Sequence, residues 1–216
     1  MKSPRKFSPR NTASPSTTPA LCCSCFGEVV MKGSDLEAEM FGAADSVKQP
    51  HLDRIRALGV TPATIAWLGS WSVPFGVVSA TTEASGIYQP GDGPAHILQP
   101  VFDNGNLIDL VIWHSMRPER WWTRTGVAWA LNVDDIAAID RWGGDALHLH
   151  ASPLDWLKNG ATGAVVLDWS APEVATLRQH DRIECSTPAL AATLTHALQT
   201  SVHMPAIETK ENRLAA

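Results

Sequence analysis

Residues 96–114 have the sequence HILQPVFDNGNLIDLVIWH, in which two apolar stretches flank the four residues DNGN. Asn-Gly tolerates the positive φ angles of a type I′ turn, so Asp103 to Asn106 predict a tight hairpin loop between two strands. The stretch VPFGVVSA at residues 73–80 is also strand-like. We therefore predict an antiparallel β lobe over residues 73–125.

Helices are predicted on the N-terminal side of this lobe. SDLE at Ser34–Glu37 is a capping box, from which a helix should run to about Ser46. HLDRIRALG at 51–59 and TPATIAWLG at 61–69 each end in glycine and predict two short helices that lie against the sheet. A helix-turn-helix would use Pro62–Leu68 to read DNA, but that segment has no Arg, Lys, Asn or Gln for base edges.

The last third of the chain alternates between strand and helix signals. A helix is predicted over GVAWALNVDDIAAIDRW, residues 126–142. Strands then follow at Ala146–His150, Ala164–Asp168 and Arg182–Cys185, with a brief further strand at Val202–Met204. Helices follow the first three strands, at Pro153–Lys158, Pro172–Gln179 and Pro188–Leu198. Three consecutive β-α units with short connections imply a parallel sheet covered by helices.

The predicted fold class is α/β, with a helical hairpin and an antiparallel β lobe followed by a three-unit β-α parallel sheet. Five parts are expected along the chain. They are a disordered or mis-called N-terminal extension at 1–30, a helical lead-in at 31–72, the β lobe at 73–125, a helical linker with the parallel β-α lobe at 126–204, and a polar tail at 205–216. The extension is rich in Ser, Pro and Thr, so either Met1 or Met31 remains open as the natural start.

Charge is distributed unevenly along the chain. Residues 1–30 hold four of the 17 basic and one of the 22 acidic residues, so their net charge is +3 and that of residues 31–216 is −8. This acidic body excludes a broad attraction to nucleic acid, and such contact would need a local basic patch. The four cysteines form no disulfide framework and no apolar run approaches a membrane span, so a cytoplasmic protein without a membrane partner is expected.

The stretch HSMRPERWWTRTG at residues 114–126 concentrates arginine and tryptophan at the end of the β lobe. Its candidate binding residues are Arg117, Arg120, Trp121, Trp122 and Arg124. Arginines interleaved with aromatic rings suit phosphate contact and base stacking in single strands. The same residues also suit a junction in which Trp fills the core and Arg pairs with acidic groups. The expected partner is single-stranded nucleic acid or a replication protein.

A metal site is the alternative interpretation. His148 and His150 would share one face of a strand, and Asp168 would follow a neighbouring strand. These three side chains could serve a small metal-dependent enzyme, although a fourth ligand is not apparent. Packed or hydrogen-bonded histidines are the favoured interpretation of this pattern, and no cofactor is expected.

The order of elements resembles the Toprim-like region of phage and plasmid primase proteins over residues 95–200. Active members of that family place a Glu just after the first strand and an Asp-x-Asp after a later one, to hold magnesium. Here the first strand leads into HASPLDW and the later one into LDWSAP, which leaves Asp168 without a second aspartate. The resemblance therefore implies a degenerate, non-catalytic accessory or binding protein associated with mobile-element replication.

Overall fold

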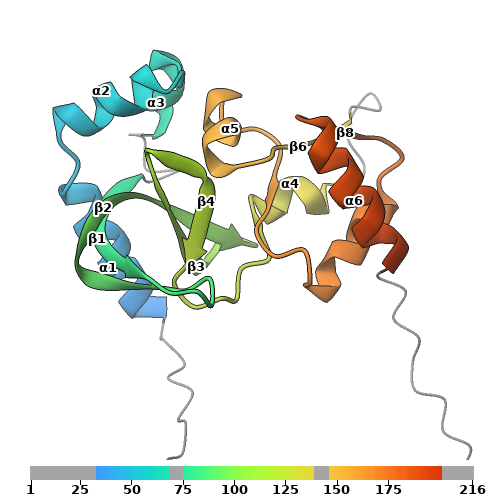
Figure 1. Ribbon diagram of the computed structural model, residues 1–216, viewed down its shortest axis with the longest axis horizontal. Coiled ribbons are helices and arrows are strands. Elements are labelled where there is room, and N and C mark those ends of the chain that lie inside the picture. The colour runs from blue at the N-terminus through green and yellow to red at the C-terminus, as the bar shows by residue number, and fades with distance from the viewer. Residues whose placement is uncertain (1–32, 69–74, 139–145, 201–216) are drawn as a thin grey trace, which may run out of the picture. The chain divides into compact units, whose positions relative to one another are not determined.

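The computed structural model describes residues 33–68, 75–138 and 146–200 (Figure 1). The chain divides into two units, residues 1–30 and 31–216, and every described residue belongs to the second. These residues combine helices with a four-stranded antiparallel sheet and two smaller sheets, which confirms the mixed α/β fold class. No helix within the described ranges is long and apolar enough to cross a bilayer.

The large sheet has the strand order β1-β2-β3-β4, with every neighbouring pair antiparallel. Its strands are β1 (Gly76–Thr82), β2 (Tyr88–Asp103), β3 (Asn106–His114) and β4 (Arg117–Thr123). The loop between β2 and β3 lies where the DNGN motif predicts it. Asn104 has a φ of 50° and Gly105 a φ of 76°, which are the positive angles that a type I′ turn requires.

The turn between β1 and β2 lies along the outer edge of the last strand. Ile87 forms a parallel bridge with Thr123, and the Thr123 amide donates to the Gly86 carbonyl at 2.9 Å. These contacts place residues 85–87 beside the C-terminal end of β4.

Both faces of the large sheet are buried, which explains the nearly continuous apolar sequence of β3. Leu110 and Ile112 point to one face, where they pack with α1 (Gly33–Asp45). Val111 and Trp113 point to the other, as the two-residue period of a strand requires. The second face is covered by α2, α3 and α5, whose bounds are Gln49–Ala57, Pro62–Leu68 and Pro153–Lys158. The predicted helical hairpin is therefore confirmed.

Three strands of the C-terminal third lie close to their predicted positions, but the parallel sheet is smaller than predicted. They are β6 (Leu147–Leu149), β7 (Val165–Val166) and β8 (Ile183–Cys185). The β6 and β8 strands pair in parallel, whereas β7 pairs antiparallel with β5 (Ala130–Leu131). One parallel bridge, Leu149 to Ala164, links the two small sheets. The β7 strand pairs with β5 because the residues that follow β7 are bonded to the residue just before β5. The amides of Leu167 and Asp168 both donate to the Trp129 carbonyl.

The helix predicted over 126–142 is wrong for most of its described length. Within residues 126–138, only α4 (Val133–Ala137) is helical, and it follows β5. Asn132 separates the two elements because it adopts a left-handed φ of 61° and its side-chain amide donates to the Gly163 carbonyl at 2.8 Å.

The remaining predicted helices are present. The segment Pro172–Gln179, η1, forms a 3₁₀ helix, and α6 extends over Pro188–Thr200. The strand predicted at Val202–Met204 lies outside the described residues.

Candidate functional site

A buried aspartate fixes the segment that follows β4. Asp109 is fully buried on β3, and its carboxylate accepts five backbone amides at 2.8–3.1 Å. Its Oδ1 accepts from Leu110, Arg124 and Thr125, and its Oδ2 accepts from Val127 and Ala128. Sequence reasoning missed this role. The available signal was a single carboxylate inside the apolar stretch LIDLVIWH.

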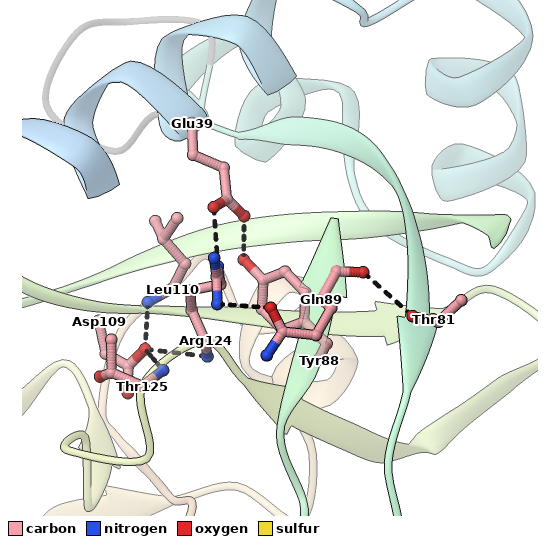
Figure 2. Close-up of polar contacts among 8 residues, drawn as sticks. All are labelled: Glu39, Thr81, Tyr88, Gln89, Asp109, Leu110, Arg124 and Thr125. Atoms are coloured by element: carbon pink, nitrogen blue, oxygen red, sulfur yellow. Dashed lines mark hydrogen bonds and ion pairs between the residues drawn. The ribbon is translucent and has the colours of Figure 1, made fainter. Parts of the chain in front are cut away.

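Arg124 belongs to a polar network that joins α1 to the sheet (Figure 2). Its Nε lies 2.9 Å from Glu39 Oε2, and one terminal nitrogen donates to Gln89 Oε1 at 3.1 Å. The Tyr88 hydroxyl donates to Glu39 Oε1 at 2.7 Å. Burial, followed by the Glu39 carboxylate, raises the pKa of Tyr88 far above its ordinary value, so the phenol remains a donor. Arg124 thus joins α1 to the sheet, with two of its guanidinium nitrogens engaged by Glu39 and Gln89.

Two other predicted arginines remain exposed, and one of them, Arg120, lies beside a tryptophan. Arg117 and Arg120 are exposed on β4, and the Arg120 guanidinium lies 5.9 Å from the centre of the Trp122 ring. The Trp122 indole donates to the Glu83 carbonyl at 3.2 Å, and His96 contacts its ring edge-on at 6.0 Å. We call Arg117, Arg120 and Trp122 the Arg/Trp platform. The Trp122 ring is thus contacted by the β1–β2 turn and by β2, and Arg120 is exposed to solvent.

Trp121 points to the opposite side of β4 and borders two hollows. A hollow of about 280 Å³ is shared with Arg120 and Trp122 of the platform. A second cavity, of about 350 Å³, is shared with Asp168 and Ser170. The Trp121 indole donates to the Leu167 carbonyl at 3.3 Å, which holds the segment after β7 against β4. The structure therefore brings Asp168 beside Trp121.

The three predicted metal ligands have separate surroundings. His148 is exposed, with Nδ1 3.4 Å from Glu184 Oε2, whereas His150 lies beyond the end of β6 and is buried. The Asp168 Oδ1 atom accepts the amide and the hydroxyl of Ser170 at 2.8 and 2.6 Å. Across the part of the chain that the structure describes, no three His, Cys, Asp or Glu side chains gather as a metal site. The metal content of the purified protein remains a prediction.

Two buried histidines are expected to make the free energy of unfolding depend on pH. His96 Nδ1 donates to the Pro94 carbonyl at 2.8 Å, and His150 Nε2 donates to the Thr162 carbonyl at 2.9 Å. The other nitrogen of His150 is buried without a partner among the described residues, so protonation would place an unsatisfied donor there. Burial lowers the pKa of both imidazoles below 6.5.

We expect the free energy of unfolding to fall as the pH drops below about 6.5. In this window the unfolded chain binds protons at both histidines and the folded chain does not, so acid favours unfolding. Urea unfolding at several pH values measures the effect, and the double variant His96→Gln, His150→Gln should flatten it. A parent stability that is independent of pH below 6.5, or an equal slope in the double variant, would contradict this assignment.

Comparison of the chain with protein-family models, with curated proteins and with solved structures finds no match. The functional interpretation therefore depends on the geometry of the chain itself.

Proposed function

We propose that this chain is a non-catalytic accessory protein that binds single-stranded nucleic acid at the Arg/Trp platform. The observation that carries the proposal is the exposed Arg120, whose guanidinium lies over the Trp122 ring at 5.9 Å from its centre. The biological setting that we propose is phage or plasmid DNA replication, as the Toprim-like order of elements implies.

The platform combines the two contacts that single strands use. Arg117 and Arg120 supply positive charge for phosphates, and the Arg120 guanidinium and the Trp122 indole supply flat surfaces for bases. The adjoining hollow of about 280 Å³ gives an unstacked base a place beside these surfaces. A duplex hides its base faces, so this arrangement favours single strands.

Nearby carboxylates limit the expected affinity. Glu83 and Glu119 line the same hollow, and residues 31–216 carry a net charge of −8. Long-range attraction to phosphate is therefore absent, and binding depends on short-range contacts at the platform. We expect the protein to bind weakly and to require low salt.

The candidate metal ligands near the predicted strand ends support the non-catalytic part of the proposal. Asp168 Oδ1 accepts the amide and the hydroxyl of Ser170, and the described His, Cys, Asp and Glu side chains do not complete a ligand set with it. A single carboxylate is a poor magnesium site. An accessory role at the platform is therefore favoured over metal-dependent catalysis.

Fluorescence anisotropy with a labelled oligothymidine of about ten nucleotides tests the proposal. We expect Arg120→Ala to weaken binding about tenfold, because it removes both a phosphate contact and the guanidinium beside the Trp122 ring. Arg56→Ala is the matched control, since Arg56 is an exposed arginine on α2 outside the platform. Circular dichroism checks that both variants fold.

The control should bind as the parent does. Equal affinities for Arg120→Ala and the parent, or equal losses of affinity in Arg120→Ala and Arg56→Ala, would contradict the assignment of binding to the platform. Preference for a duplex over a single strand would also contradict it.

A further inference from the structure

The cavity of about 350 Å³ that Trp121 shares with Asp168 and Ser170 has chemistry unlike that of the platform. It lies between the end of β4, the turn at residues 85–87 and the segment after β7. Trp121 contributes an aromatic wall, and Asp168, Ser170 and Ser85 contribute polar groups. None of its lining residues is Lys, Arg or His, so the Asp168 carboxylate has no cationic side chain beside it in the cavity.

The two serine hydroxyls of the cavity already donate hydrogen bonds within the protein. The Ser170 hydroxyl donates to Asp168 Oδ1 at 2.6 Å, and the Ser85 hydroxyl donates to Glu83 Oε2 at 3.2 Å. Each hydroxyl oxygen therefore offers a ligand only lone pairs. The Trp121 indole N–H is likewise used, by the Leu167 carbonyl.

One carboxylate oxygen remains open to a ligand. Asp168 Oδ1 accepts two bonds from Ser170, whereas Oδ2 accepts none from the residues that the structure describes. Apart from the Thr123 hydroxyl, the polar side chains of the lining thus present acceptors or groups already paired. A ligand that matches this lining must be rich in N–H donors and must not be anionic.

We propose that this cavity binds an organic cation of the guanidinium type. A flat guanidinium can lie on the Trp121 ring, where the ring quadrupole attracts it, while its N–H groups point to Asp168 Oδ2 and the serine oxygens. Guanidinium suits the cavity better than an ammonium group because it is planar and more weakly hydrated. A phosphate or carboxylate would face the charge of Asp168 without compensation.

The guanidinium group that we propose has two conceivable sources. It can belong to a free arginine-like metabolite or to an arginine side chain of a partner protein. Arg117, Arg120 and Trp122 of the platform do not line this cavity, so this inference does not depend on nucleic-acid binding at the platform.

Proton–nitrogen correlation spectra of the full chain test the proposal with N-acetyl-L-arginine amide as the probe. We expect saturable shifts of the Trp121 indole N–H and the Ser170 amide, with a dissociation constant on the order of 1 mM. The lysine counterpart should bind about tenfold more weakly, because it lacks the planar donor fork. An arginine-containing peptide that binds more tightly than the free amide would identify a partner protein as the source, and equal affinity would identify a metabolite.

Two variants make the assignment specific. Asp168→Asn retains an acceptor for the Ser170 amide but removes the charge, and it should weaken binding about tenfold. Asp181→Asn makes the same change at an exposed aspartate that does not line the cavity, and it should bind as the parent does. Trp121→Leu should also weaken binding, with the Asp168 carboxylate still present.

Three results would overturn the proposal. They are the absence of saturable shifts, equal binding by Asp168→Asn and the parent, and tighter binding of neutral guanosine than of the arginine probe. Arg120→Ala should leave probe binding unchanged. A failure of this inference is therefore separable from a failure of the nucleic-acid proposal.

Discussion

Replacement of Asp109 by asparagine is expected to lower the free energy of unfolding by about 2–6 kcal/mol. The carboxylate is fully buried and accepts five backbone amides through its two oxygens. Asparagine keeps one acceptor oxygen and turns the other position into a donor that faces amide N–H groups. At least two of these amides then lose their acceptor, at about 1–3 kcal/mol each.

Urea unfolding of parent and variant measures this change. Asp134→Asn is the matched control, because Asp134 accepts one amide, that of Asn104 at 3.3 Å, at an exposed position. The control should lose less than about 1 kcal/mol. If Asp109→Asn proves as stable as the control, the carboxylate does not organise the segment after β4.

The second large effect is expected at Arg124. Substitution by leucine should lower the free energy of unfolding by about 2–3 kcal/mol, because it leaves the mostly buried Glu39 carboxylate with the Tyr88 hydroxyl as its remaining described partner. We place the value below that of a fully buried pair, since both side chains retain some solvent contact. Arg120→Leu removes an exposed cation from β4, the strand that ends just before Arg124, and should change stability by less than about 0.5 kcal/mol.

A double-mutant cycle with Glu39→Gln and Arg124→Leu isolates the pair. The coupling should be about 1–3 kcal/mol, as for residues in one polar network. A coupling near zero, or equal losses for Arg124→Leu and Arg120→Leu, would show that Arg124 is not distinguished from the platform arginines.

Local signals account for the parts of the fold that the sequence predicts well. The β2–β3 hairpin follows from Asn104-Gly105, whose positive φ angles few other dipeptides accept. The helical hairpin of α2 and α3 follows from Gly59, which has a φ of 101°. In each case a few adjacent residues determine the backbone.

The wrong predictions have a different origin, because the parts of the fold concerned are set by contacts between residues distant in sequence. Asn132 breaks the helix predicted over 126–142 by adopting a left-handed conformation, in which its amide bonds Gly163. The partner of β7 is likewise set by tertiary contacts, and alternation of strand and helix does not specify it.

The candidate site likewise combines features that local sequence predicts with features that depend on distant contacts. Sequence alone identifies the Arg/Trp cluster but cannot separate its members, because Glu39, which pairs with Arg124, is 85 residues away. The cavity beside Trp121 is equally inaccessible to sequence reasoning, since the bond from Trp121 to Leu167 spans 46 residues.

The salt dependence of oligothymidine binding tests the platform most directly. If Arg117 and Arg120 each neutralise one phosphate, the logarithm of the association constant should fall with the logarithm of the salt concentration with a slope of about −1.4. The double variant Arg117→Ala, Arg120→Ala should lose this slope together with most of the affinity. A parent affinity that does not change with salt, or a double variant that keeps the slope and affinity of the parent, would contradict the proposal that these arginines bind single strands.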